Sequence, residues 1–255
     1  MRAHLWRPAA GGEARTVVVS HGSGGAARQM SWLTEPLAAA GFVAVAVDHH
    51  GNNFVDGYLP EGFVRWWERP LDLTLVLDQL AERESIGPVG AAGFSLGGYT
   101  AAALLGARID ASKFAALLSE EIPAQPPPEY PNLVEDVREV MSPSDLVTWP
   151  EKAGRNYADG RVLAGFLICP SVAPLLAEES LAAIERPVAV RWAGADDIAP
   201  PHENAEVYAK SIPSADGQSV GAEVGHYAFL ADNPEFAEVR ERVAAEAVAF
   251  FEARL

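Results

Sequence analysis

A serine set between two glycines is the first candidate for chemistry in this sequence. The stretch Gly93-Phe94-Ser95-Leu96-Gly97 follows an apolar run and precedes a segment rich in alanine and leucine. A strand that turns this sharply into a helix leaves no room for a Cβ two positions before or after the serine. Such a turn would hold the hydroxyl out of the sheet, at a helix N-terminus that favours negative charge. We therefore predict that Ser95 is a nucleophile.

A serine hydroxyl is a weak nucleophile at neutral pH and needs a base. The histidines that follow Ser95 are His202 and His226. His202 lies at the expected start of a helix, where a surface role is typical. His226 follows Gly225 in a loop after the last expected strand. We therefore predict His226 as the base.

The base in turn needs a carboxylate that orients it and stabilises its charged form. Asp196 and Asp197 both come directly after the apolar run that ends at Trp192. The pattern G-x-x-D-x-x-P over residues 194–200 favours Asp197 as the acid. Asp196 would instead hold the turn through its side chain. The chain order of nucleophile, acid and base is then Ser95, Asp197, His226.

Charge that develops on a substrate oxygen needs backbone N–H donors nearby. Leu96, directly after the serine, is predicted to supply one. The glycine-rich loop Ser20-His-Gly-Ser-Gly-Gly25 follows an earlier strand and is predicted to supply the other, from Ser23 or alternatively Gly24. Further contacts with a substrate are expected from Gly22, Gly24, Phe94, Trp149 and His50.

The elements that must position these residues are short apolar runs separated by helical patterns. Apolar runs without polar alternation are typical of strands covered on both faces of a parallel sheet. Alternation of such strands with helices predicts an α/β protein with a doubly wound, mostly parallel sheet, whose sites lie at the carboxyl ends of strands. We expect strands at 16–20, 42–47, 89–94, 162–168, 188–192 and 219–224, after a short N-terminal strand and turn, and helices at 28–40, 63–85, 97–107, 201–211 and 234–254.

One segment, at about 119–160, interrupts this alternation. It begins with a proline-rich stretch and continues with short helical patterns near 133–141 and 149–158. It is too long for a simple connection and too apolar for a linker. We predict a partial cap, inserted in a single domain that spans residues 1–255.

Composition excludes several other classes of function. The net charge of −16 argues against a nucleic-acid or anionic-membrane partner. A lone cysteine, Cys169, cannot form an intrachain disulfide, and a small buried side chain is its expected role. The sequence lacks a signal-peptide pattern and a long apolar span, so we expect a cytoplasmic protein. Ligand spacing typical of a metal site is also absent, and we expect neither metal nor cofactor.

The motifs together resemble a known superfamily. HGSGG, AVDHHGN, GFSLGGYT, GADDIAPP and GHYAFL are similar to those of α/β-hydrolases, and within them to the dienelactone-hydrolase and platelet-activating-factor acetylhydrolase-like bacterial esterases. The resemblance covers about 15–110 and 160–255. It implies the α/β-hydrolase fold and a serine esterase that forms an acyl-enzyme with a small ester, thioester or lactone. His50 stands where that group typically has proline, and the nucleophile is not cysteine, which favours carboxylic esters over dienelactone.

Two alternatives use the same residues differently. Gly22-Ser-Gly24-Gly-Ala-Ala27 also fits the G-x-G-x-x-A pattern of a dinucleotide-binding oxidoreductase, with Asp48 where a ribose-binding acid would lie. That alternative gives no role to Ser95 or His226. The second alternative is a hydrolase-like protein that binds a ligand without catalysis, because fold does not fix function.

Overall fold

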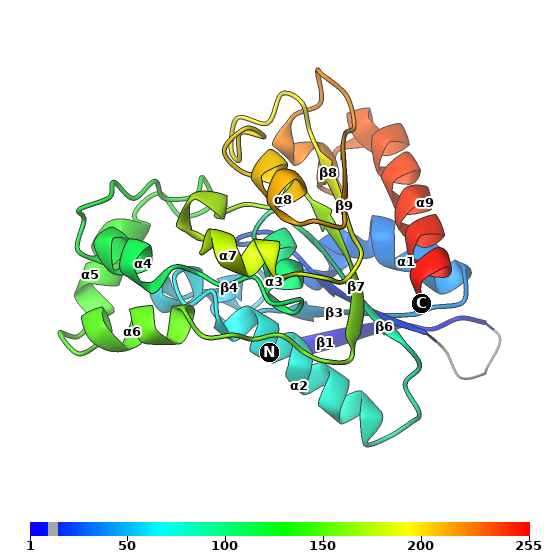
Figure 1. Cartoon of the computed structure of the whole chain (residues 1–255), viewed down its shortest axis with the longest axis horizontal. Helices are drawn as coiled ribbons and strands as arrows, with labels where there is room; N and C mark the ends of the chain where they lie inside the picture. The colour runs from blue at the N-terminus through cyan, green and yellow to red at the C-terminus, as the bar shows by residue number, and fades with distance from the viewer. Residues whose placement is uncertain (10–14) are drawn as a thin grey trace.

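A mixed sheet runs through the centre of the protein (Figure 1). The computed structural model describes residues 1–9 and 15–255, and in them the sheet has seven strands in the order β1-β3-β2-β6-β7-β8-β9. All neighbours pair in parallel except β1, which is antiparallel to β3. The strands are β1 (Arg2–Trp6), β2 (Thr16–Ser20), β3 (Val43–Asp48), β6 (Val89–Phe94), β7 (Val162–Ile168), β8 (Val188–Trp192) and β9 (Ala215–Ser219); β4 (Asn52–Asn53) and β5 (Gly57–Tyr58) form a separate small ribbon.

Helices cover both faces of this sheet. α1 (Ser31–Ala39) and α9 (Ala237–Arg254) pack on each other over one face. α2 (Glu68–Ala81), α3 (Leu96–Ala103) and α8 (Ala205–Ser211) pack on the other. The predicted doubly wound, mostly parallel architecture is confirmed. The remaining helices are α4 (Ala111–Leu118), α5 (Leu133–Val140), α6 (Asp145–Ala153) and α7 (Glu178–Ala182).

Strand β2 shows why uninterrupted apolar runs form the centre of this sheet. Val17 and Val19 point into the layer that holds α1 and α9, and Val18 points into the layer that holds α2 and α3. All three side chains are fully buried. Because successive side chains of a strand alternate between faces, a strand covered on both sides must be apolar at every position.

The last strand differs from the sequence prediction. It spans Ala215–Ser219 rather than 219–224, and its sequence ADGQS is polar. β9 is the edge strand and most of its residues are exposed, so nothing in the folded protein requires an apolar run there. Helix α2 is shorter than the predicted 63–85, and Arg69 lies on its buried face while Leu71 and Leu75 are exposed.

The segment 119–160 lies at one end of the molecule. It contains α5, α6 and the proline-rich stretch, and α6 packs against α4 (Figure 1). Sequence patterns did not predict α4, which Asp110 caps by accepting the N–H groups of Ser112 and Lys113. The turn expected after β1 falls on residues 10–14, outside the described residues.

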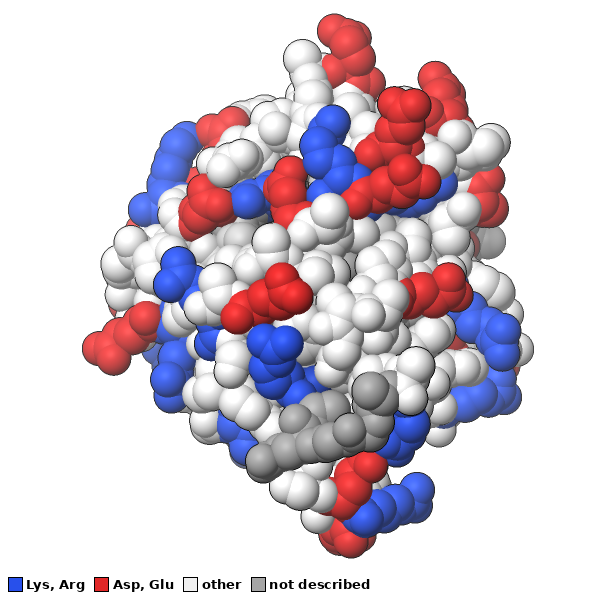
Figure 2. Space-filling view, turned by 90° about the vertical axis from the view of Figure 1, so that its right-hand side faces the viewer, with Lys and Arg blue, Asp and Glu red and all other residues white. Residues whose placement is uncertain are grey.

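Within residues 1–9 and 15–255, no helix has the length and apolar character needed to cross a bilayer. On the face seen in Figure 2, Lys and Arg side chains lie interspersed with Asp and Glu side chains. The acidic excess of the sequence therefore does not give this face a single sign.

Candidate active site

The turn between β6 and α3 holds Ser95 in a strained conformation. Its φ of 56° and ψ of −120° place a non-glycine residue where L-amino acids rarely lie. The flanking glycines explain why the turn is possible. A Cβ on Gly93 would stand against the carbonyl of Gly97, and a Cβ on Gly97 against the carbonyl of Ser20. The sharp strand-to-helix turn predicted from the G-x-S-x-G pattern is confirmed.

A chain of two hydrogen bonds leads from this serine into the protein. The Ser95 Oγ lies 3.0 Å from His226 Nε2, and His226 Nδ1 lies 2.6 Å from Asp196 Oδ2. All three residues are buried. A neutral imidazole in this position can accept the hydroxyl proton at Nε2 while its Nδ1–H donates to the carboxylate. The structure thus brings together the predicted serine and the predicted histidine.

The carboxylate in this chain is Asp196, and the prediction that Asp197 would contact His226 is wrong. Asp196 Oδ1 accepts the N–H groups of Ile198 and Ala199, at 3.1 and 2.7 Å, which holds the turn. Its other oxygen, Oδ2, faces His226. Asp196 therefore does hold the turn, as expected, but that role leaves one oxygen free for the histidine. Asp197 is exposed and lines the cavity in front of Ser95.

Two backbone N–H groups near Ser95 are candidates for binding an oxyanion. Leu96 is the first residue of α3, so its N–H has no acceptor within the helix. Ser23 lies on the loop after β2 and lines the same cavity. Gly24, the predicted alternate, donates its N–H to Asn52 Oδ1 at 3.1 Å. That bond leaves Ser23 as the better candidate for the second donor.

A buried arginine, Arg69, stabilises the glycine-rich loop after β2. The Arg69 guanidinium donates to Asn52 Oδ1 at 2.8 Å, to Thr100 Oγ1 at 3.1 Å and to Ser20 Oγ at 3.2 Å. It also donates to the carbonyl of His21. Burial lowers the pKa of Arg69 to about 9. Sequence reasoning missed this residue, although an arginine at the start of a core-facing helical stripe is a usable signal.

The same network contains a second serine, histidine and aspartate. Ser20 Oγ lies 2.9 Å from His49 Nε2, and His49 Nδ1 lies 2.8 Å from Asp72 Oδ2. Burial, followed by the nearby Arg69 charge, lowers the pKa of His49 well below its ordinary value. Burial raises the pKa of Asp72 to about 6. Ser20 is fully buried and lies outside the cavity, so this array supports the loop without access to substrate.

Replacing Arg69 with methionine should destabilise the protein measurably. The substitution removes the donors to Asn52, Ser20, Thr100 and His21, and a buried acceptor left unpaired costs about 1–3 kcal/mol. We expect the free energy of unfolding in urea to fall by about 3 kcal/mol. The exposed Arg83, replaced in the same way, is the control and should change it by less than about 0.5 kcal/mol. Equal effects at both positions would contradict a supporting role for Arg69.

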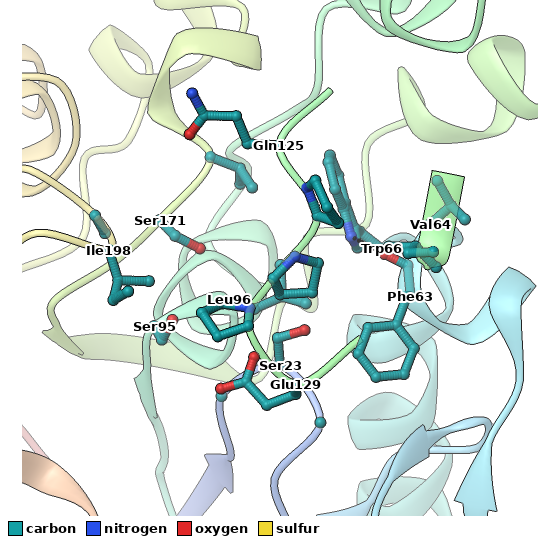
Figure 3. Close-up of a pocket in the computed structure, with 18 of the residues that line it drawn as sticks. Ser23, Phe63, Val64, Trp66, Ser95, Leu96, Gln125, Glu129, Ser171 and Ile198 are labelled. Carbon is teal, nitrogen blue, oxygen red and sulfur yellow. Dashed lines mark hydrogen bonds between the residues drawn. The ribbon is translucent and has the colours of Figure 1, made fainter. Parts of the chain in front are cut away.

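A cavity of about 940 Å³ opens in front of Ser95 and His226. Of the predicted substrate contacts, Gly22, Gly24 and Phe94 line it. Phe94 also packs on the His226 ring, with 4.8 Å between ring centroids. The cavity walls come from the loop after β2, the segment before α2, the proline-rich stretch and α5 (Figure 3).

Two predicted contacts, Trp149 and His50, lie outside this cavity. Trp149 is 2% exposed and packs against Trp67, with the Arg65 guanidinium 4.8 Å from its ring centroid. It is a core residue because α6 turns this side chain toward the body of the protein. His50 is exposed at the end of β3.

The structure argues against the dinucleotide alternative, because Asp48, the residue expected to bind the ribose, already has partners. Asp48 is 1% exposed and accepts the N–H of Ala27 at 2.8 Å, while its other oxygen lies 2.9 Å from His4 Nε2. A carboxylate held in this way ties the loop after β2 to the sheet and has no free oxygen for a ribose. His202, the other candidate base, is exposed and faces Glu203.

Cys169 lies behind the proposed acid. Its sulfur and the ligand atoms of Asp196 and His226 all lie within 4.8 Å of one another. Burial, followed by the Asp196 charge, raises the pKa of the Cys169 thiol well above its ordinary value. The residue therefore stays a protonated thiol, which packs as a small apolar side chain, as its sequence context predicted.

The chain matches a family model and is similar in fold to solved structures. The family model described as serine aminopeptidase, S33, matches residues 12–164. Among solved structures, the chain is similar to a PEG-bound complex of a novel cold-adapted esterase from an Arctic intertidal metagenomic library, at 17% identity and a TM-score of 0.58, over 99% of this chain and 88% of that chain. It is also similar to an alpha-beta serine hydrolase homologue from Coxiella burnetii, at 16% identity and a TM-score of 0.57, over 96% and 90%. No curated protein matches the chain. The resemblance to α/β-hydrolases and the predicted fold are confirmed.

Proposed function

Because the chain belongs to the S33 serine aminopeptidase family of α/β-hydrolases, we propose that it hydrolyses carboxylic esters through a covalent acyl-enzyme on Ser95. The observation that carries the proposal is the hydrogen-bonded chain from Ser95 through His226 to Asp196 at the wall of a large cavity. An activated serine needs a base within reach and a group that orients the base. Here Asp196 takes the role that the sequence assigned to Asp197.

The proposed reaction has two steps, acylation of Ser95 and hydrolysis of the acyl-enzyme. Ser95 Oγ attacks the ester carbonyl while His226 Nε2 takes its proton, and Asp196 stabilises the imidazolium that forms. The Leu96 and Ser23 N–H groups hold the oxyanion, and a lost donor of this kind typically costs about 10²–10³-fold in rate. His226 then gives its proton to the leaving alcohol. Water, deprotonated by His226, then attacks the acyl carbon. The bond from that carbon to Ser95 Oγ breaks, and His226 returns the proton to Ser95 Oγ as the acid leaves.

Esters are proposed ahead of amides on two grounds. The sequence motifs resemble bacterial esterases, and one of the similar solved structures is itself an esterase. The family description names an aminopeptidase, so the test must include amides. We further propose that the segment 119–160 acts as a partial cap on a single domain, since its proline-rich stretch and α5 wall the cavity. A cytoplasmic location stays a prediction from the sequence.

Covalent labelling with a fluorophosphonate tests this function directly. We expect one adduct by intact mass, and peptide mapping should place it on Ser95 and not on the buried Ser20 of the second array. Hydrolysis of p-nitrophenyl butyrate should exceed hydrolysis of aminoacyl p-nitroanilides at equal concentration. No adduct would favour the ligand-binding alternative without catalysis. An adduct on Ser95 with faster cleavage of the anilides would replace the esterase by an aminopeptidase.

A further inference from the structure

One wall of the cavity beyond the serine is apolar. From the segment that precedes α2, Phe63, Val64 and Trp66 form one wall, and from α5, Leu133 and Val137 face it. The Trp66 Nε1–H donates to the carbonyl of Phe63 at 2.6 Å, so its only polar atom is satisfied and the ring is left for apolar contact. A wall of this kind stabilises hydrocarbon and offers no hydrogen bonds.

Positive charge is scarce among the described residues that line this cavity. Arg138 is the one Lys or Arg among them, and it pairs with Glu120, another lining residue. The carboxylates of Glu129, Asp197 and Glu203 also line the cavity, and no described Lys or Arg pairs with them. The described lining therefore has a net negative charge, with the arginine already neutralised.

Glu129 is an exposed residue that lies over the glycine-rich loop after β2. Its Cβ is 3.1 Å from the point where a Cβ on Gly24 would stand, so it overlies the loop that carries Ser23. Figure 3 shows its carboxylate on the side of the cavity that holds Ser23 and Ser95. Tyr227, next to the base, donates its hydroxyl to Glu129 Oε1 at 3.3 Å. This bond joins the proline-rich stretch to the loop of His226.

Burial and the negative charge of Glu129 raise the pKa of two neighbouring tyrosines, Tyr227 and Tyr58. Burial and then the Glu129 charge raise the pKa of Tyr227 to about 12. The same two causes, in the same order, raise the pKa of Tyr58, which also lines the cavity and donates its hydroxyl to the carbonyl of Gly24. A second carboxylate entering this region would meet the same field.

We infer that this site takes uncharged esters with an extended apolar group, and that Glu129, with Asp197, rejects esters that carry a carboxylate. The inference rests on the proposed function, because it assigns a substrate class to the same serine. The apolar wall supplies the affinity, and the two cavity-lining carboxylates, which no described Lys or Arg neutralises, supply the discrimination. Preference for a neutral ester is the property that distinguishes this site from one built for diacid or lactone-acid substrates.

A series of esters of increasing chain length tests whether the site takes an extended apolar group. Ethyl esters of acetate, butyrate, hexanoate and octanoate, together with acetate esters of the matching alcohols, vary one side of the ester at a time. Each methylene that enters the apolar part of the cavity should raise kcat/KM by about threefold, in at least one of the two series. A flat profile in both series would overturn the apolar-group assignment.

A variant of α5 locates this effect in the cavity. Val134 lines the cavity and is half-buried, so Val134→Trp should fill space and lower kcat/KM for octanoate by about tenfold more than for acetate. Val140 lies on the same helix, is 50% exposed and does not line the cavity. Val140→Trp is the matched control and should leave the octanoate-to-acetate ratio unchanged. Equal shifts in both variants would overturn the assignment of this wall.

A matched pair of substrates measures the second part. Monoethyl glutarate carries a carboxylate where ethyl hexanoate carries an ethyl group. At low salt we expect kcat/KM for the glutarate to be at least about thirtyfold lower, and the gap should narrow as salt screens the repulsion. Glu129→Gln should raise the glutarate-to-hexanoate ratio about fivefold or more. Glu139→Gln, which removes an exposed charge from α5 outside the cavity, should not change the ratio.

Labelling separates failure of the inference from failure of the proposed function. With a fluorophosphonate adduct on Ser95, a glutarate ester cleaved as fast as hexanoate, or equal responses of the two glutamate variants, would overturn the inference alone. The absence of an adduct would overturn the function and the inference with it. An adduct, a rising chain-length profile and a Glu129-specific change of the ratio would establish the substrate class.

Discussion

Replacing Ser95 with alanine is expected to lower kcat/KM for a preferred ester by about 10⁴–10⁶-fold. The substitution removes the only atom that can form the acyl-enzyme, and it leaves His226, Asp196 and the oxyanion donors in place. The residual rate should reflect binding and the oxyanion site alone. Steady-state kinetics on purified protein, with fluorophosphonate labelling in parallel, measure both the lost turnover and the lost adduct.

The fold should survive this change. Alanine meets the same backbone strain as serine at φ 56°, and the Ser95 side chain gives up one hydrogen bond, to His226. We expect the free energy of unfolding to change by less than about 1 kcal/mol. Backbone strain at a functional site is maintained by the surrounding structure, here by the Gly93 and Gly97 contacts, and not by the hydroxyl.

The second array supplies the matched control. Ser20→Ala removes the hydroxyl that lies 2.9 Å from His49 Nε2 and leaves Ser95 untouched. We expect it to lower stability through the Arg69 network but to keep the adduct and to keep kcat/KM within about tenfold. If Ser20→Ala abolished labelling while Ser95→Ala kept it, the two arrays would exchange roles and the proposed active site would be wrong.

The sequence predicted best where one local rule sufficed. β6 and β7 have the predicted bounds, because strands covered on both faces must be apolar at every position. The turn at Ser95 was predictable because its glycines are required by sterics within a few residues. The pairing of Ser95 with His226, 131 positions apart, followed from chain order and from the carboxyl-end rule for parallel sheets.

Prediction failed where the outcome depended on residues distant in sequence. Trp149 is as apolar in a cavity wall as in a core, and only the packing of α6 against the body of the protein decides between them. Edge strand β9 is polar because it is exposed, so its sequence resembles a loop. Arg69 looks like a surface residue until the loop after β2 and Asn52 supply its acceptors. Each case needs the tertiary partner to be known first.

The adjacent aspartates Asp196 and Asp197 give the second prediction with a large expected effect on activity. Asp196→Asn is expected to lower kcat by about 10³–10⁴-fold. An asparagine can still accept the N–H groups of Ile198 and Ala199 through one oxygen, so the turn should persist. The atom facing His226 Nδ1 would then be an amide NH₂. It cannot accept Nδ1–H, so it would favour the tautomer whose Nε2 already carries a proton and cannot take one from Ser95.

Asp197→Asn is the matched control, because it removes the same charge one residue away. Asp197 is exposed and has no hydrogen bond to His226, so its loss should change kcat for a neutral ester by less than about fivefold. Asp197→Asn should have a larger effect on esters that carry a carboxylate, because it removes a negative charge that repels them. Stopped-flow measurement of acylation with both variants separates these outcomes. A large loss of acylation in Asp197→Asn with little loss in Asp196→Asn would restore the sequence assignment. It would also mean that the hydrogen bond between Asp196 and His226 serves the turn alone.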